Sequence, residues 1–312
     1  MGARERRQFR DAKPTPRARP PPFSSPAALA RKRAEYASLV PAHYARAIAP
    51  GAPLDDAAAL RQVAVDAPRT APGVALFARP DVQAALVRLL YIWGVRHPAS
   101  GYVQGVNDLV VPLLAALLGD AAESAGVVGL PPAALADPAD PAWATALLPP
   151  DALAAAEADA YACLGRLLQG VQDSYTPGQP GIQRAVARAA SVVARVAPSL
   201  SAHLAAIGAD YMQFAFRWAN CLLAREVPLP ASMRLFDTWI AEGARVSDFV
   251  AYACASFLVT WQTELEGRDF QDAVLFLQRP PTCSWSEADV EPVLARAFLW
   301  RASFGGAPSH LG

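Results

Sequence analysis

Apolar residues recur at helical spacing along most of the chain from Pro26 onward. In the stretch SPAALARKRAEYASLV, Ser25 stands directly before Pro26, which is a good signal for the start of a helix. The stretch RPDVQAALVRLLYIWGVRH predicts a helix that begins near Asp81 and ends at Arg96 and His97, where the helix dipole favours positive charge. Its apolar face consists of Val82, Leu86, Leu89, Leu90 and Trp93. Further helices are expected at 151–173, 179–197, 209–226, 230–242, 246–265, 269–278 and 286–302.

The same pattern predicts the fold class. Strand signals are almost absent, because Ala and Leu dominate and runs of β-branched residues are short. No fixed repeat period is visible, which disfavours a solenoid. We therefore expect one all-α domain over residues 27–305, with an amino-terminal half near 27–118 and a carboxy-terminal half near 151–305. The segment 119–150 is low-complexity in Ala, Pro and Asp and is interpreted as a surface loop inserted between the halves.

One predicted helix starts with unusual polar residues. In HPASGYVQGVNDLVVPLL, residues 97–114, Ser100 is a plausible N-cap, and Val103, Val106, Val110, Leu113 and Leu117 would form the core-facing stripe. On that helix Gln104, Asn107 and Asp108 would share one face near the amino-terminal end. Gly105 would let another backbone come close, and Pro112 should kink the helix.

Two interpretations of these polar residues stand side by side. Asn107 and Asp108 are typical of a first turn in which side chains merely cap backbone groups. Gln104 is different, because glutamine caps poorly and a buried amide needs partners. A glutamine at a helix end would suit the orientation of a small polar partner, such as a water molecule.

A second unusual stretch is RQVAVDAPRTAPGVALF, residues 61–77. Pro68 and Pro72 flank Arg69 and predict an extended, rather rigid loop. Asp66 lies three residues before Arg69 and could hold its guanidinium by a charged hydrogen bond. Arg69 is therefore either a side chain that reaches into another molecule or a surface arginine that pairs locally with Asp66.

Composition narrows the classes of function. The 312 residues are 53% hydrophobic and carry 28 basic and 28 acidic residues, so bulk charge does not indicate a nucleic-acid binder. Residues 1–26 form a basic segment rich in Pro and Arg, expected to be a disordered tail, and 306–312 are expected to be a second tail. No apolar run is long enough to span a bilayer. The four cysteines and four histidines are scattered, which predicts free thiols, no metal site and no cofactor of its own.

Several motifs together resemble one family, the TBC-domain family of Rab GTPase-activating proteins. QVAVDAPRT is similar to its I-x-x-D-x-x-R motif, with Val63 in place of isoleucine, and SGYVQGVND is similar to its Y-x-Q motif. FAFRWANCLLAREVPL (214–229) and MRLFDTWIAE (233–242) resemble its later helical signatures. DFQDAVLFLQRPP (269–281) with Trp285 is similar to a Golgi-associated subfamily. The likeness covers about residues 28–305.

The resemblance implies a V-shaped, all-helical domain that accelerates GTP hydrolysis by a GTP-bound Rab, acting as an activator and not as an enzyme with its own substrate. Arg69 matches the arginine finger and Gln104 the glutamine finger, while GTP and Mg²⁺ would be bound by the Rab. Tyr102, Asn107 and Asp108 would shape the helix start, and Asp66 would steady Arg69. Arg217 and Asp237 match further positions and are expected in a structural ion pair or hydrogen-bond network.

Two other functions remain open, and one feature departs from the family. The place of its R-x-x-x-W helix holds RRQFRDAKPTPRARPPPF, whose prolines exclude such a helix. A catalytically inactive scaffold that binds a Rab or another partner is the first alternative. An unrelated helical adaptor whose basic tail binds RNA or membrane is the second. The expected location is cytoplasmic and peripheral at Golgi or other endomembranes, and the sequence does not name the Rab, because specificity lies in surface complementarity.

Overall fold

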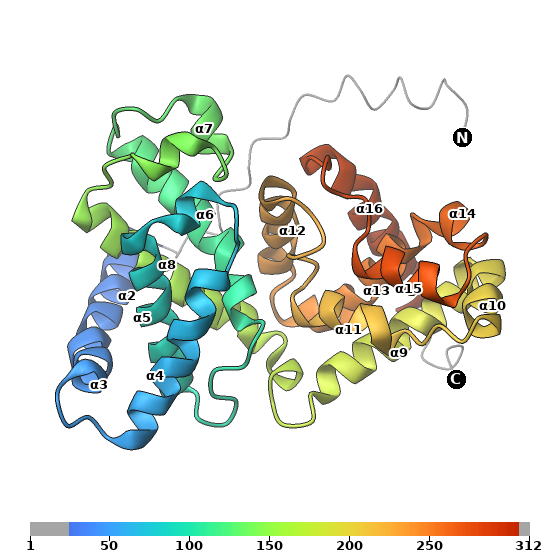
Figure 1. Cartoon of the computed structure of the whole chain (residues 1–312), viewed down its shortest axis with the longest axis horizontal. Helices are drawn as coiled ribbons and strands as arrows, with labels where there is room; N and C mark the ends of the chain where they lie inside the picture. Colours follow the sequence, from blue (N-terminus) through green and yellow to red (C-terminus); the bar gives the residue numbers. More distant parts are fainter. Residues whose placement is uncertain (1–24, 306–312) are drawn as a thin grey trace.

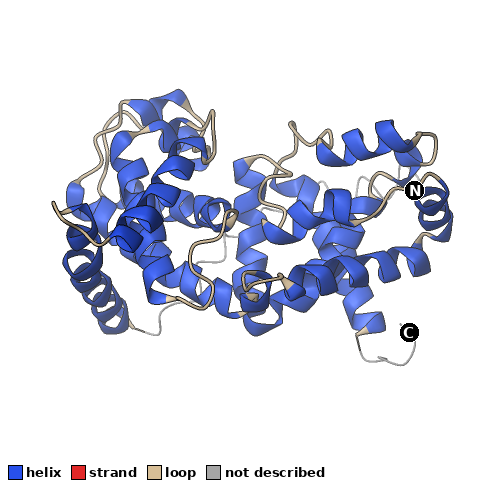
Figure 2. Cartoon of the chain, turned by 60° about the horizontal axis from the view of Figure 1, so that its bottom comes forward, coloured by secondary structure: helices blue, strands red, loops and turns tan. Residues whose placement is uncertain are grey.

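The computed structural model describes residues 25–305, and this part of the chain folds into helices with no strand (Figure 2). The all-α prediction is therefore confirmed. The helices are α2 (Pro26–Leu39), α3 (Arg46–Ile48), α4 (Leu54–Asp66), α5 (Pro80–Arg96), α6 (Val106–Ser124), α7 (Pro132–Ala136), α8 (Pro150–Gln169), α9 (Pro180–Val196), α10 (Pro198–Ala206), α11 (Met212–Asn220), α12 (Leu229–Glu242), α13 (Val246–Val259), α14 (Gln262–Leu265), α15 (Phe270–Gln278) and α16 (Glu287–Phe304).

Two groups of helices lie side by side (Figure 1). Helices α2 to α8 form the amino-terminal half, in which α8 packs against α2, α5 and α6. Helices α9 to α16 form the carboxy-terminal half around α13, and α12 packs against α6 and α8 to join the two. The predicted border at 119–150 is wrong, because α8 covers the apolar faces of helices that precede it and so belongs to the amino-terminal half.

The segment 119–150 also differs from the predicted surface loop. Helix α6 continues to Ser124, and the segment then forms α7 and a short 3₁₀ turn, Pro141–Ala144. Trp143 in that turn is fully buried, and its indole N–H donates to the carbonyl of Ala134 at 2.8 Å. Burial of one large aromatic side chain fixes the segment against the domain, although its composition is that of a loop.

Helix α2 begins as the sequence predicts and is then anchored by side chains that the sequence does not reveal. The Ser25 hydroxyl accepts from the amide of Ala28 at 3.2 Å, as an N-cap residue does. Arg33 forms a bidentate ion pair with Asp159 on α8, at 2.9 and 2.6 Å. The predicted tails and the place of the R-x-x-x-W motif fall at 1–24 and 306–312, outside the described residues, apart from the last two residues of the predicted tail, Ser25 and Pro26.

Other predicted helices hold with shifted ends. Helix α4 was not expected. Its first residues, 54–60, had no predicted structure, and its remaining residues belong to the stretch from 61 that was expected to be a loop. The helices expected at 151–173, 209–226 and 246–265 end earlier or are divided by turns. The four cysteines are free thiols, as predicted, and three of them are buried.

Candidate functional site

Arg69 lies at the end of a tight turn that follows α4. Val63 and Ala67 are 1% and 2% exposed and attach the end of the helix to the core. The chain then forms a 3₁₀ turn, Ala67–Arg69, which the Thr70 hydroxyl closes by donating to the carbonyl of Asp66 at 2.9 Å. The expected extended loop is therefore wrong, since Pro68 with its fixed φ fits a tight turn equally well. The Arg69 side chain is exposed, and it makes no ion pair with any residue in 25–305.

Gln104 lies in a second turn, immediately before α6. The helix begins at Val106, and its N-cap residue is Gly105, in the left-handed region at φ 109°. The prediction that Ser100 caps the helix is wrong: the Ser100 amide donates to the carbonyl of His97 at 3.1 Å, in the turn that ends α5. Gln104 therefore does not share a helix face with Asn107 and Asp108. It is exposed, whereas Asn107 is buried.

Gly105 is required at this turn for two reasons. Its positive φ is one that L-residues rarely adopt. In addition, a Cβ atom there would lie 2.3 Å from the side-chain nitrogen of Asn220, which belongs to α11 in the other half of the domain. A close approach at Gly105 is thus observed, but it is made by the side chain of Asn220 and not by another backbone, as was expected.

Two hydrogen bonds join the Arg69 turn to the Gln104 turn. The Tyr102 hydroxyl donates to the carboxylate of Asp66 at 2.8 Å, and the Asn107 amide donates to the hydroxyl of Thr70 at 2.9 Å. The Asn107 side-chain oxygen also accepts from the amide of Gly105 at 3.0 Å. Asp66 therefore holds Tyr102 and not Arg69, which corrects the predicted partner. The two turns are positioned as one unit.

The electrostatics of the Tyr102–Asp66 bond keep the phenol protonated. Burial, together with the Asp66 carboxylate, raises the pKa of Tyr102 well above its usual range. The hydroxyl therefore remains a donor throughout the physiological pH range. The sequence contains Thr70 next to Arg69, but only the structure shows it as a buried link between the turns, because nothing in the sequence indicates its partner Asn107.

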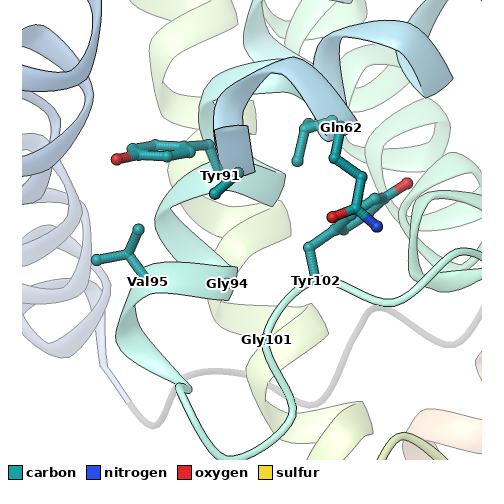
Figure 3. Close-up of a pocket in the computed structure, with 8 residues that line it drawn as sticks. Gln62, Tyr91, Gly94, Val95, Gly101 and Tyr102 are labelled. Carbon is teal, nitrogen blue, oxygen red and sulfur yellow. The ribbon is translucent and has the colours of Figure 1, made fainter. Parts of the chain in front are cut away.

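A small pocket lies beside Tyr102, between α4 and α5 (Figure 3). Its volume is about 120 Å³, with the Gln62 and Tyr102 side chains near each other and Tyr91 across from them. A Cβ atom on Gly94 would lie 3.1 Å from the backbone nitrogen of Tyr102, so this glycine lets the Tyr102 segment pack against α5. The pocket is mostly apolar.

Asp108 lies in the first turn of α6, and its side chain is 15% exposed. It accepts a weak hydrogen bond from the Cys221 thiol at 3.7 Å, and Arg225 lies 3.9 Å away. Burial raises the pKa of Asp108 above its usual range, with Arg225 opposing that shift. Asp108 was expected to shape the start of the helix. It also contacts the carboxy-terminal half, to which both Cys221 and Arg225 belong.

A pH-dependent stability difference follows for Asp108→Asn. A carboxyl whose pKa is raised by folding contributes stability below its unfolded pKa and loses it as pH rises through its folded pKa. The free energy of unfolding of Asp108→Asn, relative to the original chain, should therefore increase between about pH 4.5 and about pH 7.5. Urea unfolding at both pH values measures it, with Asp120→Asn, an exposed site on α6, as the control. A constant or decreasing difference contradicts the prediction.

Arg217 and Asp237 lie on α11 and α12. Arg217 donates to both carboxylate oxygens of Glu226 at 2.7 Å each and to the carbonyl of Gln278 at 2.6 Å. Burial raises the pKa of Glu226, and Arg217 opposes that shift. Arg217 is thus part of an ion pair, as expected, and Asp237 is half-buried. Sequence reasoning missed Glu226, because nine residues with an intervening turn give no helical spacing.

Two further observations concern the described residues 25–305. No group of three or more His, Cys, Asp or Glu side chains in this part is arranged to hold a metal ion. None of its helices is both long and apolar enough to cross a membrane.

The chain resembles proteins of one family over nearly its whole length. GTPase-activating protein gyp1 of Schizosaccharomyces pombe is 42% identical over 284 residues, which are 91% of this chain and 52% of that protein. Human TBC1 domain family member 22A is 41% identical over 286 residues, with the same coverage of 91% and 52%. The chain thus spans about half the length of these curated relatives.

Structural comparison agrees with the sequence comparison. The crystal structure of the Ypt/Rab-GAP domain of Gyp1p matches with a TM-score of 0.76 and 36% identity, over 89% of this chain and 82% of that one. The family model described as Rab-GTPase-TBC domain matches residues 53–266, a range that contains both Arg69 and Gln104. The chain therefore belongs to the Rab-GTPase-TBC domain family.

Proposed function

We propose that this chain stimulates GTP hydrolysis by a GTP-bound Rab-family GTPase and donates Arg69 and Gln104 to the reaction. The observation that carries the proposal is the pair of hydrogen bonds, Tyr102 to Asp66 and Asn107 to Thr70, which hold two exposed turns together. Each turn presents one polar side chain of the type that phosphoryl transfer requires. The names of the relatives, a GTPase-activating protein and a Ypt/Rab-GAP domain, support the same activity.

Arg69 would stabilise negative charge on the phosphate oxygens. In phosphoryl transfer the charge spreads over these oxygens in the transition state, and an arginine supplied by a second protein lowers the barrier. The guanidinium is planar and always charged, so it can donate two parallel hydrogen bonds to phosphate oxygens. The exposed position of Arg69, outside any ion pair with residues 25–305, leaves its donors available to a partner.

Gln104 would orient the attacking water. Its amide oxygen can accept from the water while its amide nitrogen donates to a phosphate oxygen, two tasks that few neutral side chains combine. Orientation matters because a small misplacement of a reacting group costs a large factor in rate. The Gln104 turn is held by Gly105, Asn107 and Tyr102, which keep the backbone of the residue in place.

The experiment measures phosphate release from a panel of GTP-loaded Rabs, with the original chain and with Gln104→Ala. We expect stimulation of at least one Rab by orders of magnitude and a loss of about 10²-fold or more on substitution. Gln271→Ala, which removes an exposed glutamine from α15, is the matched control and should keep full activity.

Other outcomes separate the alternatives. A folded chain that binds a Rab without stimulating it overturns the proposal and identifies an inactive scaffold. Normal stimulation by Gln104→Ala overturns the role of that residue alone. An adaptor whose basic tail binds RNA or membrane would need residues 1–26, and its binding would be salt-sensitive.

Recruitment to membranes belongs to the same proposal. A Rab-directed activator works at the cytoplasmic surface where its substrate resides, so we infer a peripheral position at Golgi or other endomembranes. The resemblance to the Golgi-associated subfamily supports this location. Fluorescence microscopy of the tagged protein against Golgi markers tests it, and an even cytoplasmic distribution contradicts it.

A further inference from the structure

We propose that Asn220, at the end of α11, is a positioning residue for Gln104, and this inference rests on the proposed function. Asn220 belongs to the carboxy-terminal half, whereas the turn that it touches belongs to the amino-terminal half. Its side-chain nitrogen donates to the backbone carbonyl of Gln104 at 3.4 Å. The same nitrogen lies 2.3 Å from the position that a Cβ atom on Gly105 would take. The Gln104 turn is therefore held from both halves of the domain.

The backbone around Asn220 is fixed by specific contacts. The hydroxyl of Tyr175, which is 3% exposed, donates to the Asn220 carbonyl at 2.5 Å. Immediately after it, Leu222 and Leu223 both adopt positive φ, at 50° and 63°. Residues other than glycine rarely adopt such conformations, and the surrounding structure must enforce them. This strained turn places Asn220 and Cys221 at the Gln104–Asp108 segment, with Cys221 on the Asp108 carboxylate.

Stability alone does not account for an asparagine at this position. The residue is 8% exposed, and its side-chain oxygen forms no hydrogen bond with any residue in the described part of the chain. A buried amide oxygen without a partner costs free energy. Its nitrogen, besides a contact of 4.0 Å with the Cys221 sulfur, is used on the Gln104 carbonyl. The free-energy cost of the unpaired oxygen therefore accompanies a contact with Gln104, the residue that we propose orients the attacking water.

The geometry also explains why the contact is made to the backbone. A hydrogen bond to the Gln104 carbonyl fixes the orientation of that peptide while leaving the side-chain amide free for a partner molecule. Asn107 holds the other side of the same peptide by accepting from the Gly105 amide at 3.0 Å. Two side chains, one from each half, thus hold the carbonyl and the amide of the single peptide that joins Gln104 to Gly105.

The test is a double-mutant cycle between Asn220 and Gln104, read as phosphate release from the Rab that the panel identifies. Asn220→Ala should lower the maximal stimulated rate about tenfold, equal to about 1.4 kcal/mol, with little change in the domain concentration that gives half of that rate. In the Gln104→Ala background the same substitution should have no further effect, because the residue that it positions is gone. A purely structural role would give the same loss in both backgrounds.

Further variants keep the test decisive. Asn220→Leu preserves volume and removes the donor, so it replaces Asn220→Ala if that variant unfolds. Ser232→Ala removes another buried polar group without a hydrogen bond, on α12, and should leave the rate unchanged. Equal losses in both backgrounds, or full activity of Asn220→Leu, overturn the inference. If the original chain stimulates no Rab, the proposed function fails first, and the two failures are distinguishable.

Discussion

Arg69→Ala is expected to reduce the stimulated rate of GTP hydrolysis by about 10³–10⁵-fold, the range for loss of an arginine supplied in trans. This corresponds to about 4–7 kcal/mol of barrier. The reason is that the developing charge on the phosphate oxygens loses its guanidinium partner, whereas the rest of the binding surface is intact. Single-turnover phosphate release from the responsive Rab, at saturating concentration of the variant, measures the effect. Binding of the Rab in its GTP form should persist.

Two further variants test whether activity requires the guanidinium group at position 69 or only positive charge on this surface. Arg69→Lys keeps the charge but loses the planar fork, so it should recover only a small part of the activity. Arg61→Ala removes an exposed arginine from α4, eight residues before Arg69, and should change the rate far less. If Arg61→Ala were as inactive as Arg69→Ala, the effect would be one of long-range charge. If Arg69→Ala kept most of its stimulation, Arg69 would not be the finger.

The sequence identifies Arg69 and Gln104 because both depart from what their surroundings require. An arginine between two prolines and a glutamine before an apolar helix are not explained by packing, and both are exposed at turns in the structure. Residue type and local spacing predict such positions well. They predict the local backbone less well, since the expected extended loop is a 3₁₀ turn and the expected first helical turn lies outside α6.

The start of α6 illustrates why local signals were insufficient. Ser100 has the side chain of an N-cap, and Pro98 and Gly101 surround it as helix-start signals would. The N-cap residue is nevertheless Gly105, five residues later, because Gly105 adopts a left-handed conformation against Asn220, more than one hundred residues away. A tertiary contact of this kind overrides local propensity, and a single sequence contains no signal for it.

Ion pairs and hydrogen bonds between distant elements were missed for the same reason. Asp66 has Arg69 as its nearest basic neighbour in sequence, but its partner is Tyr102 on another segment. Helix α2 buries only Tyr36, and two side chains on α8, Asp159 and Glu157, bind it by hydrogen bonds. The composition predicts that buried charges need partners, but it does not say which ones.

Glu157→Ala is expected to cause a large loss of stability in the amino-terminal half. Glu157 is 3% exposed and accepts from the Tyr36 hydroxyl at 2.6 Å, and from Arg88 on α5 at 3.0 and 2.6 Å. It therefore joins α2, α5 and α8 through one carboxylate. Removing one partner of a buried pair leaves the other charge desolvated and unpaired, which costs about 3–5 kcal/mol. Urea unfolding followed by circular dichroism measures the change in the free energy of unfolding.

The matched control lies on α2, the helix that Glu157 binds through Tyr36. Glu35→Ala removes an exposed carboxylate whose ion pair with Lys32, at 3.3 Å, is open to solvent, and such pairs contribute about 0–1 kcal/mol. The contrast between the two glutamates tests whether burial, and not charge pairing as such, makes Glu157 important. Equal small effects would mean that α2 is held by packing alone. An equal large effect would mean that charge on α2 stabilises the half in general, and the hydrogen bonds of Glu157 would then not explain how α2 is attached.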